Sequence, residues 1–430
     1  MISWMLFIVF VPYIAAPLYF LIGIRKRDRP HQKEMAQFPH IKEYEEYHIF
    51  DTEHALANIL RKNGIPPASK ANSFKLITND VEAYEAMMDA IESAQESIEI
   101  ATYVFEFDAM TTKMVEALTQ KARMGVTVRL MMDTVGSLGA YLRPGRFDAL
   151  KRAGGEVAFF LPIIKRPFQS YINLRNHRKI YLFDQKLLLS GGMNLSNEYM
   201  GPPDGTKRWS DLMYRLEGPA VQHFRSIFKN DWEYATGTTI EPNRAVVKRF
   251  EGESLVQVVP SGPDIPKDAL YEALLNAIYS AKERIWIVTP YFVPDENIVQ
   301  ALVIAAHKGV DVKLITPKNS DHLLTDLVRS SYMRELHENK IDVVLFEGEM
   351  LHAKAILIDS LGGMVGSLNL DNRSLFLNYE VVTFVYSPEF IDEMECWMKR
   401  LIGSSVRDME QPGKMREAFE NIMKVFAPMV

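Results

Sequence analysis

The sequence predicts an α/β protein of two similar lobes related by a pseudo-twofold axis, preceded by an N-terminal transmembrane helix. Three observations support this: the chain repeats itself, helical patterns alternate with short β-branched runs in both halves, and the first residues carry no charge. Alternation of this kind is typical of helices packed on a largely parallel sheet. At 430 residues the chain is long enough for two or three domains.

Residues 1–24 are predicted to anchor the protein in a membrane. No charged residue occurs from Ile2 to Ile24, and a helix of that length spans about 34 Å, enough for the ~30 Å hydrocarbon core. Basic residues follow between Arg25 and Arg29, and none precedes the segment, which is the wrong order for a cleaved signal peptide. The positive-inside bias predicts that the rest of the chain is cytoplasmic. The alternative is a buried core helix.

The remaining chain divides into a connector and two lobes. Residues 25–70 are polar and form a predicted juxtamembrane connector, and a short helical pattern within it ends at Gly64 and the prolines that follow. The internal repeat then defines lobe 1, residues 71–245, and lobe 2, residues 252–430. Two matched pairs of segments carry the repeat: Ser93–Thr102 with Ser280–Thr289, and Gly125–Leu130 with Gly309–Leu314.

The composition excludes several classes of protein. Apolar residues at 47% and charged residues at 24% are the globular average, so the chain is neither disordered nor fibrous. The single cysteine, Cys396, excludes an internal disulfide framework and a cysteine-only zinc cluster. The net charge of -6 argues against a general nucleic-acid binder, which usually has a basic excess. We therefore expect no nucleic-acid partner.

One chemical motif occurs once in each lobe. Both copies read H-x-K-x-x-x-x-D, and an asparagine in a tight glycine turn follows each histidine at the same distance along the chain. Two such matches at equivalent points of a repeat rarely arise by chance. The residues are His177, Lys179, Asp184 and Asn194 in the first copy, and His352, Lys354, Asp359 and Asn369 in the second.

The spacing within the motif predicts which side chains act together. Ile180–Phe183 and Ala355–Ile358 have the character of strands, and residues two apart on a strand point to the same side. The histidine and the lysine of each copy should therefore share a face. Asp184 and Asp359 belong to the same candidate catalytic motifs, but their odd offset near the strand end predicts a structural role.

A face of histidine, lysine and asparagine suits a phosphodiester. Lysine is a point charge for phosphate oxygens, the asparagine amide adds a neutral donor, and histidine can be a nucleophile or an acid near neutral pH. Two lobes supply two histidines on opposite sides of one phosphorus, as in-line displacement requires. The alternatives are two structural histidines, or a zinc site, which lacks a third ligand at suitable spacing and would be repelled by the lysines. We expect no metal.

The doubled motif resembles the signature of the phospholipase D superfamily, and the flanking residues are similar to the bacterial cardiolipin synthase family. The resemblance covers nearly the whole chain. The chain departs from the family in having one N-terminal hydrophobic segment where members often have two, and Gly192 where they often have serine. The flanks include Leu174–Lys179, Trp209–Asp211, Glu217–Val221, Pro260–Asp264, Thr289–Pro294 and Gly366–Ser374.

The resemblance implies two phospholipase D-like lobes, each a mixed β-sheet flanked by helices, and chemistry that needs neither cofactor nor metal. It points to His177 as the nucleophile and to His352 as the acid and later the base. It also implies that Asp211 and Glu380 orient the two imidazoles. The substrate phosphate would be held by Lys179, Lys354, Asn194 and Asn369.

The activity implied by the resemblance is phosphatidyl transfer at the bacterial inner membrane. One phosphatidylglycerol would donate its phosphatidyl group to another through a phosphohistidine, giving cardiolipin and glycerol. The implied partners are phosphatidylglycerol, other anionic phospholipids and the membrane, and an oligomer is compatible with the sequence. Two alternatives stay open: a hydrolase, either a phospholipase D or a nuclease, in which water resolves the same intermediate, and a non-catalytic membrane scaffold.

Overall fold

The computed structural model describes residues 42–49, 55–162, 173–240, 249–265 and 267–407, with a few isolated positions nearer the ends. The predicted anchor, residues 1–24, lies almost wholly outside the described residues, as do most of residues 25–54 and the part of lobe 2 beyond residue 407. No helix within the described ranges is long and apolar enough to span a bilayer.

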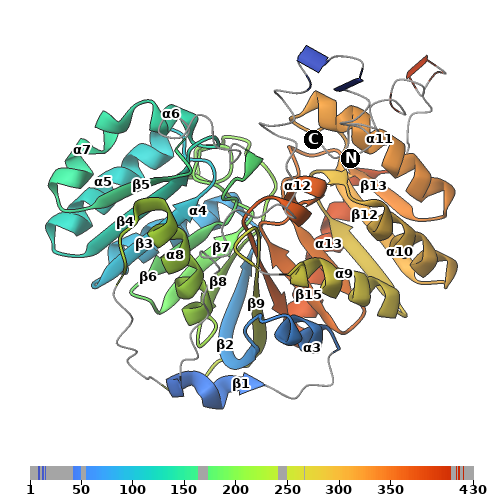
Figure 1. Cartoon of the computed structure of the whole chain (residues 1–430), viewed down its shortest axis with the longest axis horizontal. Coiled ribbons are helices and arrows are strands. Elements are labelled where there is room, and N and C mark those ends of the chain that lie inside the picture. The colour runs from blue at the N-terminus through green and yellow to red at the C-terminus, as the bar shows by residue number, and fades with distance from the viewer. Residues whose placement is uncertain are drawn as a thin grey trace.

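A single large sheet joins the two lobes (Figure 1). From the middle outward, the strand order is β2-β8-β7-β6-β3-β4-β5 in lobe 1 and β9-β17-β15-β14-β10-β12-β13 in lobe 2. The central strands β2 and β9 pair antiparallel, so a pseudo-twofold axis between them would generate this matched order. The lobe 1 strands are β2 (Ala68–Ile77), β3 (Ser97–Thr102), β4 (Thr127–Asp133), β5 (Glu156–Phe160), β6 (Ile180–Phe183), β7 (Leu187–Gly191) and β8 (Met213–Glu217). Those of lobe 2 are β9 (Ser254–Ser261), β10 (Arg284–Val288), β12 (Asp311–Pro317), β13 (Asp342–Phe346), β14 (Ala355–Ile358), β15 (Gly362–Gly366) and β17 (Glu380–Val385).

The sheet is mixed, so the expectation of a largely parallel sheet was wrong. Only β3, β4 and β5, and their counterparts β10, β12 and β13, run parallel. The other neighbours are antiparallel, because short turns join β6 to β7 and β14 to β15 and such turns reverse the chain. The two matched pairs of segments that define the repeat cover β3, β4, β10 and β12 of the parallel part, whereas the repeated motif covers the antiparallel pairs β6–β7 and β14–β15. Three short strands lie at the margins: β1 (His48–Ile49), β18 (Ser405–Val406), and β11 (Phe292–Val293), which pairs with β16 (Leu370–Asp371).

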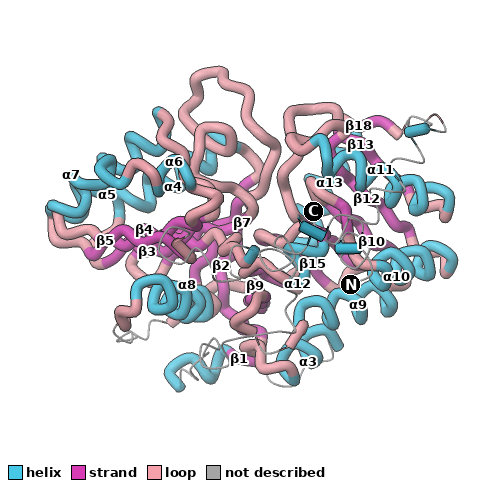
Figure 2. The backbone as a smooth tube through the Cα atoms, turned by 45° about the horizontal axis from the view of Figure 1, so that its top comes forward, coloured by secondary structure: helices cyan, strands magenta, loops and turns pink. Residues whose placement is uncertain are grey.

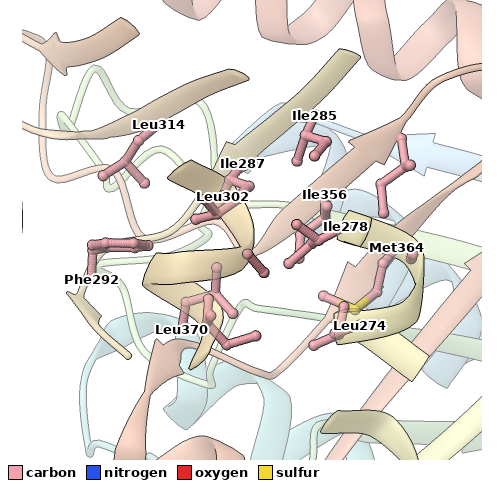
Figure 3. Packing of buried hydrophobic residues seen from close by; sticks show 14 of the residues in the cluster. Leu274, Ile278, Ile285, Ile287, Phe292, Leu302, Leu314, Ile356, Met364 and Leu370 are labelled. Atoms are coloured by element: carbon pink, nitrogen blue, oxygen red, sulfur yellow. The ribbon is translucent and has the colours of Figure 1, made fainter. Parts of the chain in front are cut away.

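Helices cover both faces of the sheet (Figure 2). In lobe 1, α4 (Asp80–Ser93), α5 (Ala109–Arg123) and α7 (Asp148–Arg152) pack on one face. In lobe 2 the same face carries α9 (Ala269–Ser280), α10 (Glu296–His307) and α11 (Leu323–Glu338), whose core is drawn in Figure 3. The connector contributes α3 (Ala55–Lys62), which packs on α9. Shorter helices are η2 (Lys42–Tyr47), α6 (Leu138–Tyr141), η3 (Pro144–Phe147) and α12 (Asn372–Phe376).

A third core fastens the lobes to each other. Helices α8 (Val221–Thr236) and α13 (Pro388–Gly403) bury apolar residues in one cluster that includes strands of both lobes. Helix α8 contacts β9 of the other lobe, and α13 contacts β2. This reciprocal packing fixes the middle of the sheet, above which loops of both lobes come together (Figure 2).

Leu302→Ala is expected to destabilise lobe 2. Leu302 lies on α10, is 1% exposed and packs inside the core of Figure 3, so truncation removes buried surface and leaves a cavity. We expect the free energy of unfolding in urea to fall by about 2–5 kcal/mol. The control is Leu142→Ala, because Leu142 is 61% exposed, and its effect should stay within about 0.5 kcal/mol. Equal effects of both changes would contradict this account of the core.

Candidate active site

Backbone pairing across the lobes brings each motif histidine beside an acidic residue of the other lobe. Asn176 of lobe 1 forms a β-bridge with Tyr379 of lobe 2, and Ser210 forms one with Leu351. Next to these bridges, the His177 amide donates to the Tyr379 carbonyl at 2.9 Å, and the His352 amide donates to the Ser210 carbonyl at 2.8 Å. Because Glu380 and Asp211 directly follow the bridged residues, the register of the backbone delivers a carboxylate to each imidazole.

The carboxylates bind the Nδ1 atoms of the rings. His177 Nδ1 lies 3.0 Å from Glu380 Oε2 and 3.0 Å from the Ser367 carbonyl oxygen. His352 Nδ1 lies 2.7 Å from Asp211 Oδ2. A carboxylate on Nδ1 fixes the orientation and tautomer of an imidazole and stabilises the imidazolium when it forms. Nε2 is then the nitrogen that remains for chemistry on each ring.

Both histidines line the same cavity, which has a volume of about 740 Å³. Asn194 and Asn369 line it as well, whereas the buried Lys179 and Lys354 lie beneath it. Asn194 Oδ1 accepts a hydrogen bond from the Val104 amide at 3.2 Å. Asn369 Oδ1 is buried and has no protein partner among the described residues, so a ligand in the cavity could complete its hydrogen bonding.

Aromatic rings enclose the two imidazoles. Tyr103 packs edge-on against His177 with ring centroids 4.9 Å apart, and Tyr199 packs in the same way against His352 at 5.1 Å. Trp209 adds a second ring beside His352 at 5.4 Å. These contacts bury the site and lower its local dielectric, which strengthens the interactions of charges inside it.

The two lysines are held close to the histidines, and their pKa values lie below the usual range. Lys179 Nζ donates to the His177 carbonyl at 2.9 Å, and Lys354 Nζ donates to the His352 carbonyl. Burial lowers the pKa of Lys179 to about 7 although Glu380 opposes the change. Burial likewise lowers the pKa of Lys354 to about 8, against the opposing effect of Asp211. An incoming phosphate would favour the charged form of both.

Burial favours the neutral form of both imidazoles by lowering the pKa of each ring. It lowers the pKa of His177, and Glu380 opposes this. It lowers the pKa of His352 to about 3, helped by the nearby charge of Lys354. For Asp211, burial would raise the pKa, but Lys354 and His352 outweigh it and hold the pKa below its usual value. Neutral imidazoles beside ionised carboxylates are suited to nucleophilic attack.

Asp184 and Asp359 are not brought into this cavity. The Asp184 carboxylate accepts the backbone amides of Gln95, Glu96 and Ser97 at 2.6–2.9 Å. The Asp359 carboxylate accepts those of residues 282–284 at 2.8–2.9 Å. Each aspartate therefore fastens the end of a motif strand to the start of β3 or β10. They touch neither histidine, so grouping them with the catalytic residues does not match their positions.

Sequence reasoning did not single out Ser367 and Arg178, which support the Glu380 side of the site. Ser367 Oγ donates to Glu380 Oε2, and Arg178 Nε donates to the Glu380 carbonyl at 3.1 Å. The signal was present in the repeat, because the counterparts of these residues in the other lobe are Gly192 and Ala353. A Cβ atom at Gly192 would lie 2.2 Å from Asp211 Oδ1, which explains why serine is absent there.

Within the described ranges, no group of three or more histidine, cysteine, aspartate or glutamate side chains could hold a metal ion.

Comparison with known proteins matches the sequence of this chain to a family. Residues 87–232 and 274–402 match the family model described as "Cardiolipin synthase, PLD-like domain". The chain belongs to this family. It is 34% identical to cardiolipin synthase A of Edwardsiella ictaluri over 80% of this chain and 72% of that protein. It is 32% identical to cardiolipin synthase A of Buchnera aphidicola over 99% of this chain and 91% of that protein.

Solved structures support the fold. The crystal structure of phosphatidylserine synthase from Haemophilus influenzae superposes with a TM-score of 0.67, covering 87% of this chain and all of that one. Polyphosphate kinase from Porphyromonas gingivalis gives 0.51 over 91% of this chain and 59% of that one. The sequence identities are only 12% and 13%, so these likenesses concern the mixed α/β fold alone.

Glu380→Gln is expected to lower turnover strongly without unfolding the protein. The amide keeps the shape of the side chain but removes the charge that stabilises a protonated His177. Turnover should fall by about 10²–10⁴. Asp359→Asn is the matched control, because it is also a carboxylate-to-amide change but lies outside the cavity. It should lower the free energy of unfolding by about 1–3 kcal/mol with activity per folded molecule near wild type. The reverse pattern would contradict the assignment.

Phosphodiester binding should be coupled to proton uptake. Burial lowers the pKa of Lys179 to about 7 and that of Lys354 to about 8, and both would have to be charged to hold an anion. Below pH 7 they are already protonated, so affinity should be flat; above pH 8 it should fall as pH rises, by linkage. Calorimetry with soluble glycerophosphoglycerol at pH 8.5, in two buffers of different ionisation enthalpy, measures the protons taken up. Lys354→Gln should reduce that number, and binding without proton uptake would contradict the prediction.

Proposed function

We propose that the protein is a membrane-bound cardiolipin synthase, an enzyme that transfers a phosphatidyl group from one phosphatidylglycerol to another and releases glycerol. One observation carries the proposal: two histidines, each bonded to a carboxylate of the opposite lobe, line a single cavity. The names of relatives that match over most of the chain supply the substrate class.

The proposed reaction has two steps. In the first, His177 Nε2 attacks the donor phosphorus, the bond to the glycerol headgroup breaks, and His352 gives its proton to the departing oxygen. In the second, the neutral His352 takes the proton of an acceptor hydroxyl while that oxygen attacks phosphorus and the bond to His177 breaks. The covalent phosphohistidine divides one difficult transfer into two easier ones.

The residues around the histidines support this assignment of roles. Glu380 would stabilise positive charge on His177 as the phosphoramide forms, and Asp211 would stabilise protonated His352. Lys179, Lys354, Asn194 and Asn369 would hold the phosphate oxygens, the lysines through their ammonium groups and the asparagines through their side-chain amide nitrogens. These four side chains would bind the negative charge of the donor phosphate, and His352 would protonate the leaving oxygen.

The membrane assignment follows from the sequence. Residues 1–24 would span the bacterial inner membrane once, and the basic cluster after them would keep the catalytic part cytoplasmic. Phosphatidylglycerol and other anionic phospholipids of that membrane would then be the substrates. The opening to the cavity would have to face the lipid surface.

Detergent-solubilised protein incubated with radiolabelled phosphatidylglycerol is expected to give cardiolipin and glycerol. Phosphatidic acid as the main product would indicate a hydrolase instead, and no turnover would contradict an enzymatic function. In denatured samples trapped during turnover, wild type should carry acid-labile label on histidine. His177→Ala should lose both label and turnover, whereas His223→Ala, a buried histidine outside the cavity, should keep the label. Label retained in His177→Ala would reverse the roles of the two histidines.

A further inference from the structure

The two ends of the cavity are related by the repeat but differ in charge. Aligning His177 with His352 and Asn194 with Asn369 places Arg373 opposite Glu198. The same alignment makes Met350 the counterpart of Arg175. Arg175, Arg373 and Glu198 all line the cavity, so a symmetric scaffold presents guanidinium groups at one end and a carboxylate at the other.

Arg373 reaches across the lobes to the end of the cavity that holds His177. It lies on the short helix α12, between Asn369 and Glu380. Its Nη1 and Nη2 donate to the side-chain and backbone oxygens of Asn173 in lobe 1, at 2.8 and 3.3 Å. Both acceptors are neutral, and no carboxylate of the described residues lies within ion-pair distance of the guanidinium. Arg373 therefore has no direct ion-pair partner among the described residues, although its charge opposes the rise in the pKa of the nearby Asp371 that burial causes, and it lies at the wall of the cavity.

Arg175 and Tyr103 place this charge close to the reaction centre. The Arg175 guanidinium is buried and pairs with Asp133 at 3.4 Å. Burial and Asp133 raise the pKa of Tyr103, and both Arg373 and Arg175 oppose that rise, which puts both guanidinium groups near the ring that packs on His177.

The opposite end of the cavity is unfavourable for an anion. Glu198 and Asp321 are exposed residues of its wall, and Tyr291 donates its hydroxyl to Asp321. Partial burial and the neighbouring charges of Glu106 and Asp321 raise the pKa of Glu198, as expected where carboxylates gather. A second anion in the cavity would therefore be held more favourably at the arginine end.

We propose that Arg373, supported by Arg175, forms a second anion subsite that binds the phosphodiester of the acceptor phospholipid. This rests on the proposed function, in which the acceptor is itself a phosphodiester and the product has two phosphates. Three carbons of glycerol separate the attacking hydroxyl of the acceptor from its own phosphate, so this second phosphate stays in the same cavity, beside the reacting one. In this arrangement the lysines bind the reacting phosphate, and the arginines bind the phosphate of the acceptor.

The consequence is selection among acceptors that compete for one phosphohistidine. In the second step the histidine–phosphorus bond breaks, the acceptor oxygen bonds to phosphorus, and the hydroxyl proton goes to His352. Phosphatidylglycerol would gain a charge-assisted contact with Arg373, which an uncharged alcohol or water cannot make. The subsite thus favours synthesis of cardiolipin over hydrolysis.

The test measures how the intermediate divides between two acceptors. Solubilised enzyme receives labelled phosphatidylglycerol together with 1-butanol, and the ratio of cardiolipin to phosphatidylbutanol is measured. This ratio depends only on steps after the intermediate has formed. Arg373→Gln should lower it by about tenfold, the usual scale for one charge-assisted contact. Arg373→Lys should restore it in part, and Arg123→Gln, at an exposed position on α5, should leave it unchanged.

Each outcome has one meaning. A fall in the ratio with retained phosphatidylbutanol supports the subsite. A parallel fall of both products overturns it, because Arg373 would then act on the donor or on folding. Should Arg373→Gln fail to fold, the wild-type ratio as a function of salt decides: screening should lower it, and a ratio independent of salt overturns the proposal. Wild type that yields phosphatidic acid and no cardiolipin would instead contradict the proposed function itself.

Discussion

The site depends on a reciprocal backbone exchange between the lobes. Asn176 pairs with Tyr379, and Ser210 pairs with Leu351, so the segment that carries each histidine is held by the segment that carries the opposite carboxylate. Neither lobe has a complete catalytic pair by itself. The continuous sheet and the core shared by α8 and α13 keep these segments in register, because a shift of one residue would turn every side chain to the other face.

This arrangement concentrates buried charge, which is costly unless every group is compensated. The guanidinium of Arg178 shows how the compensation works. It is fully buried between Asp231 and Asp264, at 2.6 and 2.9 Å, and packs over the ring of Tyr379. Its Nη2 also donates to the Ser261 carbonyl at 3.2 Å, and its Nε donates to the Glu380 carbonyl at 3.1 Å. One residue thus ties α8, the loop after β9 and the carboxylate that orients His177 into a single network, so the geometry of the histidine is fixed by the packing of both lobes.

Much of the site could be predicted from the sequence because the residues of each motif copy lie close together along the chain. The strands Ile180–Phe183 and Ala355–Ile358 occur as expected, and the spacing of His177 and Lys179 anticipated that they would lie together. The odd offset of Asp184 anticipated its distance from the histidines. The resemblance implied that Glu380 orients an imidazole, but the spacing could not show that its partner is His177, since the pair joins residues 203 positions apart through a bridge between lobes. The alternation of helical and strand patterns did not indicate the antiparallel part of the sheet, whereas the mixed sheet implied by the resemblance was confirmed.

In the proposed reaction a symmetric scaffold performs asymmetric chemistry, because one imidazole would attack while the other would move a proton. The two lobes differ at the residues that surround the two imidazoles and their carboxylates. Ser367 and Arg178 both support Glu380, but their counterparts Gly192 and Ala353 offer Asp211 no such hydrogen bonds. Lys354 instead lies against the ring of His352, within 2.8 Å of Nδ1, and helps to lower its pKa to about 3. Burial is the larger cause of this low pKa, and an anion that offset the charge of Lys354 would raise it. In the proposed reaction the substrate phosphate would be that anion, so substrate binding would favour the protonated His352 that acts as the acid.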